Sequence, residues 1–121
     1  MKQDEGLEIR ELIDRRREAH KKLLAVELER LKTVAPELGI KRMILFGSLA
    51  KREPRLTTDL DLLIVWDTPL GFLERTVELY RQLQPRVAAD LLVYTPGEME
   101  KMRETPLVRR ALEEGKVLYE A

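Results

Sequence analysis

The run DLDLLIVW, residues 59–66, constrains the fold of this chain more than any other segment. Its last five residues are continuously apolar, which is typical of a buried strand. Two carboxylates, Asp59 and Asp61, nevertheless open the run. A carboxylate that enters an apolar interior is costly unless it is paired or binds a metal. The segment therefore predicts a buried strand whose first residues have a chemical role.

Strand and helix patterns alternate along the rest of the chain. A long helix is expected over residues 7–34, ending at Pro36 and Gly39, because apolar residues recur on one face. That face consists of Leu24, Leu28, Leu31 and Ala35. Strands are expected at 41–46, 60–66 and 87–94, helices at 72–83, from 96 to 102 and at 106–114, and an edge strand at 116–119. This order indicates an α/β (α+β) fold, in which helices pack on a small mixed β-sheet and a long N-terminal helix is added.

Two local patterns refine the helices that follow the second strand. Leu73, Val77, Tyr80 and Leu83 are spaced to form the apolar face of the helix at 72–83. The segment from Thr95 to Glu98 is typical of a helix cap, with a proline in the first turn.

Composition excludes several classes of function. The 121 residues suit one domain, and the 22 basic and 22 acidic residues balance. That balance argues against direct binding to nucleic acid or to an anionic membrane surface. The chain has no cysteine and one histidine, His20, which excludes thiolate chemistry and histidine metal clusters. Because no signal peptide or long apolar run is present, we expect a cytoplasmic protein that does not enter a membrane.

The two aspartates that open the apolar run are spaced to hold cations. Alternation along a strand points Asp59 and Asp61 the same way, with their Cα atoms about 6.6 Å apart. Two-metal phosphoryl-transfer sites hold ions about 3.5–4 Å apart, which suits this spacing. Asp90, within the strand-like run RVAADLLVY, is the best third carboxylate. Oxygen ligands alone favour Mg²⁺ or Mn²⁺ over zinc.

Gly47 and Ser48 supply a complementary anion site where the strand at 41–46 ends. A glycine at such a turn lets backbone N–H groups approach a phosphate, and the next helix begins with free donors. The Ser48 hydroxyl and the Lys51 ammonium group, one turn further on, would reach the same anion. Each feature alone is common, since Gly-Ser is an ordinary turn and Asp-x-Asp is often a pair at a loop edge. Their combination is what points to phosphoryl chemistry.

The pattern G-S-x10-D-x-D, from Gly47 to Asp61, with a third aspartate in a later strand, resembles the DNA polymerase β-like nucleotidyltransferase superfamily. More narrowly, residues 40–94 are similar to its minimal nucleotidyltransferase (MNT) branch. The resemblance implies one nucleotidyltransferase domain over 1–121, with an accessory N-terminal helix (1–36), a catalytic core (40–95) and C-terminal helices (96–121). The chain departs from many relatives at Lys51-Arg52 and at Thr58, which leaves the loop geometry open.

The same resemblance implies a role for each site residue. Gly47 and Ser48 would hold the triphosphate of ATP, with Lys51 beside them. Asp59 and Asp61 would bind two Mg²⁺ ions, and Asp90 would be the third metal ligand and the base near the acceptor. MNT relatives often act as antitoxins of HEPN-type toxins, and some transfer AMP to a toxin tyrosine. We therefore expect a protein adenylyltransferase with a HEPN-type toxin as its partner.

Two other interpretations stay open at this point. The chain would be a non-enzymatic antitoxin if the helix at 7–34 neutralised a partner by docking alone, and the same leucine-bearing helix would also allow a homo-oligomer. The carboxylates would alternatively bind a structural cation. A pure binding module has no need for Asp59, Asp61 and Asp90 in one pocket, so the set of three favours the enzyme.

Overall fold

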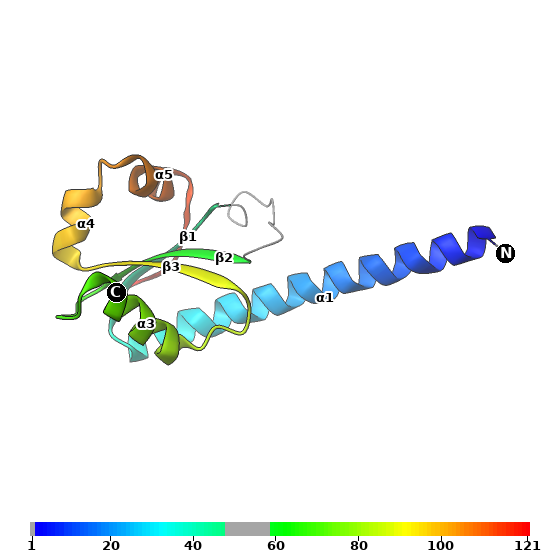
Figure 1. Ribbon diagram of the computed structural model, residues 1–121, viewed down its shortest axis with the longest axis horizontal. Coiled ribbons are helices and arrows are strands. Elements are labelled where there is room, and N and C mark those ends of the chain that lie inside the picture. The colour runs from blue at the N-terminus through cyan, green and yellow to red at the C-terminus, as the bar shows by residue number, and fades with distance from the viewer. Residues whose placement is uncertain (1, 48–58) are drawn as a thin grey trace.

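A four-stranded sheet forms the centre of the molecule, and helices lie on both of its faces (Figure 1). The computed structural model describes residues 2–47 and 59–121. The helices and strands are α1 (Lys2–Glu37), β1 (Ile40–Phe46), β2 (Leu60–Trp66), α3 (Phe72–Leu83), β3 (Ala89–Tyr94), α4 (Pro96–Met102), α5 (Pro106–Glu114) and β4 (Lys116–Glu120). The strands follow the order β3-β2-β1-β4.

The sheet is mixed, as the sequence predicts. Strand β1 pairs antiparallel with β2 and with β4, whereas β2 and β3 run parallel. Parallel strands need a crossover connection, and α3 supplies it between β2 and β3. The expected start of the third strand at residue 87 is early by two residues, since β3 begins at Ala89.

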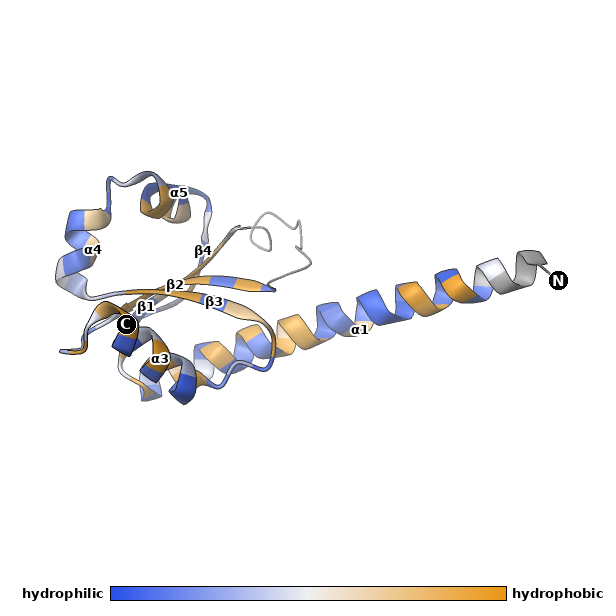
Figure 2. Ribbon diagram, viewed as in Figure 1, coloured by the Kyte–Doolittle hydropathy of each residue, from blue (hydrophilic) through white to orange (hydrophobic). Residues whose placement is uncertain are grey.

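Each face of the sheet has its own apolar core, and Figure 2 shows the strands as mainly hydrophobic. One core packs β1, β2 and β3 against α1 and α3, with Leu31, Leu62 and Leu79 fully buried. The other packs Leu63 and Val65 of β2 against α4 and α5. Successive residues of β2 thus alternate between the two cores, which is why the run from Leu62 to Val65 contains no polar residue.

Only the C-terminal part of α1 packs on the sheet. Leu24, Leu31 and Ala35 are buried there, which confirms the predicted apolar face. The helix extends through Pro36 to Glu37, one residue beyond the expected proline boundary, and Gly39 ends the turn in the left-handed region at φ 76°. Every side chain from residue 8 to residue 23 is exposed, and this segment projects away from the sheet (Figure 1).

A buried ion pair anchors α1 to the loop between α3 and β3. The Glu27 carboxylate accepts hydrogen bonds from Arg30 Nε at 2.6 Å and from the backbone N–H of Arg86 at 2.6 Å. Arg30 Nη2 also donates to the carbonyl of Leu83 at 2.9 Å. The hydrogen bond from Arg30 lowers the pKa of Glu27 although burial opposes that shift, and the Arg86 N–H lowers the pKa further.

The apolar face predicted for α3 is wrong at three of its four positions and right at Leu83. Leu73, Val77 and Tyr80 are exposed. The residues that α3 buries are Arg75, Leu79 and Leu83. The face that α3 turns inward therefore carries the guanidinium group of Arg75, whose partners are the Leu70 and Val93 carbonyls and the Glu98 carboxylate.

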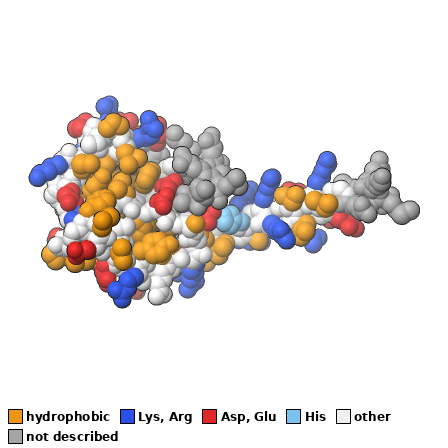
Figure 3. Space-filling view, in the orientation of Figure 1, with side chains coloured by type: hydrophobic (Ala, Val, Ile, Leu, Met, Phe, Trp, Pro, Cys, Tyr) orange, Lys and Arg blue, Asp and Glu red, His pale blue; other side chains and the backbone are white. Residues whose placement is uncertain are grey.

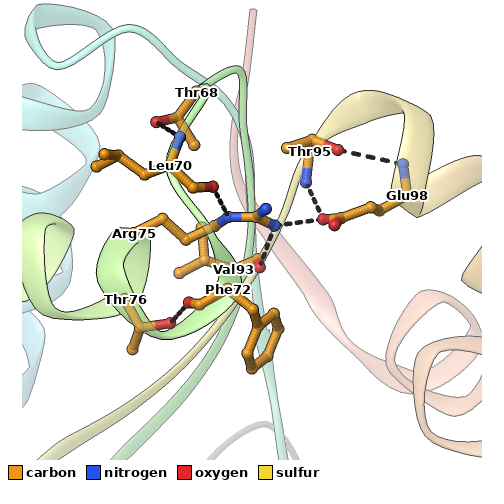
Figure 4. A network of polar contacts seen from close by, with 8 residues as sticks. All are labelled: Thr68, Leu70, Phe72, Arg75, Thr76, Val93, Thr95 and Glu98. Atoms are coloured by element: carbon orange, nitrogen blue, oxygen red, sulfur yellow. Dashed lines mark hydrogen bonds and ion pairs between the residues drawn. The ribbon is translucent and has the colours of Figure 1, made fainter.

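Arg75 joins α3 to the turn between β3 and α4 (Figure 4). Its Nε donates to the carbonyl of Leu70 at 3.0 Å, and its Nη1 pairs with the Glu98 carboxylate. Glu98 completes a capping box with Thr95, which confirms the predicted cap of α4. The hydrogen bond from Arg75 lowers the pKa of Glu98, and the Thr95 N–H adds to that effect. The network is at the opposite end of β3 from Asp90.

Within the part of the chain that the structure describes, no helix is both apolar enough and long enough to cross a bilayer.

Candidate active site

Asp61 and Asp90 stand side by side at one end of the sheet. Each is the second residue of its strand, and the parallel register makes them direct partners across β2 and β3. Neighbouring strands are about 4.8 Å apart, and in-register residues point to the same face. Asp61 also faces Phe46, the last residue of β1, across the antiparallel pair. The two carboxylates are therefore on the face that carries α4 and α5, beyond the end of the apolar core formed by Leu63 and Leu92.

These carboxylates line a cavity of about 550 Å³ that opens to solvent. Its walls are mostly apolar and come from five elements of the fold, β1, β2, α3, β3 and α5. The lining residues are Phe46, Asp61, Thr76, Tyr80, Ala89, Asp90, Leu91, Leu92 and Leu107. The volume is within the range of small-molecule sites, roughly 300–1,000 Å³. The cavity combines two acidic groups with mostly apolar walls.

Gly47 borders the same acidic pair. It follows Phe46 directly and has φ 75°, a conformation that L-residues with side chains rarely adopt. A Cβ atom built on Gly47 would lie 2.3 Å from Asp61 Oδ2, which is too close for any real contact. The absence of a side chain at Gly47 is thus what leaves room for the Asp61 carboxylate. Two residues that the sequence assigns to one site are in contact in the structure.

Asp59 has a different neighbour. It precedes β2 at a bend, and its backbone N–H and that of Leu60 both donate to the carbonyl of Ala88, at 2.9 and 3.1 Å. Because two successive N–H groups share one acceptor, the regular alternation of the strand begins only after Asp59. The Asp59 carboxylate is hydrogen-bonded to His20 Nε2 of α1 at 2.9 Å. Asp59 does not line the cavity that holds Asp61 and Asp90.

Comparison with known proteins decides the family. Residues 29–121 match the family described as "Polymerase beta, Nucleotidyltransferase". The chain belongs to this family. The match includes Gly47, Asp61 and Asp90 and leaves out most of α1.

Two solved structures are similar to this nucleotidyltransferase. One is a crystal structure of a toxin–antitoxin with AMP-PNP, 17% identical, with a TM-score of 0.49. The other is the toxin–antitoxin MntA-HpeT carrying two Asp-to-Glu substitutions, 15% identical, with a TM-score of 0.47. Both comparisons cover 78% of this chain and 73% of the other. A search of curated proteins found no match.

The donors around the nucleotidyltransferase cavity suit a hard divalent cation. Asp61 and Asp90 offer carboxylate oxygens, and no imidazole or thiol group lines the cavity with them. Across residues 2–47 and 59–121, however, no three or more His, Cys, Asp or Glu side chains are grouped closely enough to hold a metal ion. The structure thus brings together two of the three predicted ligands, Asp61 and Asp90. The third, Asp59, is hydrogen-bonded to His20 instead.

The remaining site predictions, Ser48 and Lys51, lie outside the described residues. His20 is the residue that sequence reasoning missed at this site. A single histidine in a charged helix gave no signal of its own, because its partner Asp59 is 39 residues away in the chain.

Proposed function

We propose that this nucleotidyltransferase moves AMP from ATP onto an acceptor hydroxyl, that of a tyrosine in a HEPN-type toxin, and so acts as an antitoxin in the cytoplasm. The observation that carries the proposal is the in-register pair Asp61 and Asp90 in a cavity beside Gly47. The family assignment gives that pair its chemical context.

The residues at the cavity divide into a phosphate side and an acceptor side. Gly47, with its positive φ and no side chain, would let backbone N–H groups approach the triphosphate, and Ser48 and Lys51 would add donors there. Asp61 and Asp90 would hold Mg²⁺ together with Asp59. The bound ions would neutralise phosphate charge and lower the pKa of the acceptor hydroxyl.

The transfer is a single displacement at phosphorus. The acceptor oxygen forms a bond to the α-phosphorus of ATP, the bond from that phosphorus to the bridging oxygen breaks, and pyrophosphate leaves with the electron pair. The hydroxyl proton passes to the Asp90 carboxylate and then to water. Asp90 suits this role because its side chain is exposed at the cavity mouth, where an acceptor can reach it. Positioning and charge neutralisation supply most of the rate.

The walls of the cavity support an aromatic acceptor. Tyr80 and Leu107 are both exposed and stand with Leu92 around the carboxylates. An incoming tyrosine ring would bury apolar surface against them, which favours a protein side chain over a charged small molecule. Figure 3 shows apolar side chains gathered on this face of the domain. The choice of a HEPN-type toxin follows from the resemblance of the Gly47–Asp61 motif to the MNT branch.

The test is transfer of label from α-labelled ATP to the HEPN-type protein that co-purifies with the chain. We expect a mass increase of one AMP on a tyrosine. Asp90→Asn should lower the rate at least about a hundredfold, because the charge neutralisation at such a site is worth several kcal/mol. Asp67→Asn is the matched control, since Asp67 is exposed beyond the far end of β2. Equal rates for wild type and Asp90→Asn would refute the proposal.

The exposed segment of α1 supports a second candidate, an antitoxin that acts by docking alone. Ile9, Leu12 and Ile13 are exposed on this segment and are available to another protein. If docking suffices, the Asp90→Asn variant will neutralise the partner as well as the wild type does. If AMP transfer is required, it will not.

A further inference from the structure

A contact between His20 and Asp59 joins the projecting helix to the start of β2, next to the candidate site. His20 lies in the segment of α1 in which every side chain from residue 8 to residue 23 is exposed. Its Nε2 atom is nevertheless 2.9 Å from Asp59 Oδ1. A carboxylate can only accept, so the imidazole N–H donates. Figure 3 shows the histidine, in pale blue, where α1 leaves the rest of the molecule.

We propose that His20 is a positioning residue that holds the Asp59 carboxylate outside the Asp61–Asp90 cavity and competes with a divalent cation for it. The inference rests on the proposed function, since it takes these aspartates as cation ligands. It goes beyond that function because it makes α1 a determinant of cation affinity at the site. Most of α1 lies outside the family match.

Three observations carry the inference. Asp59 is absent from the cavity lining, although Asp61, two residues on, is part of it. No described group of three acidic or histidine side chains is assembled for a metal. Finally, Asp59 is the more enclosed partner, with 20% of its side chain exposed against 46% for His20, and the imidazole occupies one of its carboxylate oxygens.

The backbone around Asp59 leaves its side chain free to exchange partners. Asp59 precedes the first residue of β2 and its N–H is bonded to the Ala88 carbonyl, so a change of partner needs only a rotation of the side chain. Cation binding would replace one hydrogen bond from His20 with a metal–oxygen contact. Removing the imidazole removes the competitor and should tighten cation binding about fivefold, the factor that one net hydrogen bond is worth.

The experiment titrates Mn²⁺ into the full chain without nucleotide and measures the dissociation constant by calorimetry. We expect His20→Ala to bind Mn²⁺ about fivefold more tightly than the wild type. His20→Gln should stay close to the wild type, because the glutamine amide keeps an N–H donor at a similar reach. Lys22→Ala is the control for the loss of a positive charge on α1, and it should change the constant less than twofold, since an exposed charge is strongly screened.

A double-mutant cycle ties the effect to the contact. In an Asp59→Asn background, His20→Ala should leave the Mn²⁺ dissociation constant unchanged, because the carboxylate for which His20 and the cation compete is absent. Weaker or unchanged binding by His20→Ala in the otherwise wild-type chain would overturn the inference, as would equal tightening by Lys22→Ala. Failure of the proposed function looks different. In that case Asp61→Asn and Asp90→Asn would bind Mn²⁺ as the wild type does, whatever residue 20 is.

Discussion

Asp61 and Asp90 are direct partners across the parallel strands β2 and β3, so two carboxylates share one face of the sheet at its open end. Like charges directly opposite each other on a sheet are destabilising, by up to about 1 kcal/mol. A cation bound between the two carboxylates would offset that repulsion. Four measurements test this pair, the neighbouring Gly47, and the Glu27 and Arg75 networks elsewhere in the fold.

The first concerns the acidic pair itself. In metal-free buffer we expect Asp90→Asn to raise the free energy of unfolding by about 0.5 kcal/mol, because it removes the repulsion with Asp61. Mg²⁺ should raise the melting temperature of the wild type and should have little effect on the variant, since ligands stabilise only the state that binds them. Thermal unfolding with and without Mg²⁺ measures both. A variant that Mg²⁺ stabilises as much as it does the wild type would contradict the assignment.

The second concerns Gly47. Gly47→Ala and Gly39→Ala both place an L-residue at a φ near 75°, so each should cost about 1–2 kcal/mol of stability. Only the new methyl group at residue 47 meets another side chain, that of Asp61, whereas nothing lies within 4 Å of the one at residue 39. Asp61 can rotate away, so the extra loss should fall on Mn²⁺ affinity. Denaturation measures the loss of stability and calorimetry measures Mn²⁺ affinity on the same samples. Equal Mn²⁺ affinities for Gly47→Ala and Gly39→Ala would show that the contact between residue 47 and Asp61 is unimportant.

The third concerns the anchor of α1. Glu27→Gln should lower the free energy of unfolding by about 2 kcal/mol at pH 7, because Glu27 is buried and accepts charge-assisted hydrogen bonds. The pKa of Glu27 is lowered in the fold, so its contribution is complete above its ordinary value of 4.5 and is lost as the pH falls through the lowered folded value. The difference between wild type and variant should therefore shrink in acid. Glu29→Gln, at an exposed pair with Lys32, should change stability by less than about 0.5 kcal/mol.

The fourth concerns Arg75. Arg75→Met should destabilise the fold by about 2–3 kcal/mol, since it removes the donor to the carbonyl of Leu70 and leaves the Glu98 carboxylate with the Thr95 N–H but without its ion pair. Arg75→Lys should recover little of this, because one ammonium group does not span both partners as a guanidinium does. Urea denaturation measures the cost. Arg81→Met, on the exposed side of the same helix, is the control, and a similar loss there would mean that the network contributes little.

The strands and helices could be read from the sequence because each is encoded locally. The periodicity from Leu60 to Trp66 and the turn residues after it place β2 without knowledge of its neighbours. The Asp61–Asp90 pair was predictable as well, since both acids interrupt strand-like runs.

The predictions that failed concern features that depend on contacts between distant segments of the chain. Spacing alone favours Leu73 and Val77 as the buried side of α3, yet the helix buries Arg75, whose partners Val93 and Glu98 come later in the chain. The position of Asp59 failed to follow from strand alternation for a similar reason. The backbone N–H groups of Asp59 and Leu60 both donate to the Ala88 carbonyl, and the Asp59 carboxylate is hydrogen-bonded to His20, which is 39 residues away in the chain.

The projecting part of α1 affects the entropy cost of binding for any protein that binds to it. From residue 2 to residue 23 it extends about 33 Å, at about 1.5 Å per residue. Glu11 and Arg15 are one helical turn apart, and Glu18 pairs with Lys21 at 3.6 Å, so charges within the segment help it keep its shape in water. A binding partner therefore contacts a segment that is already helical. The entropy cost of ordering that a disordered tail would add to complex formation is therefore largely absent, so more of the contact energy appears as affinity.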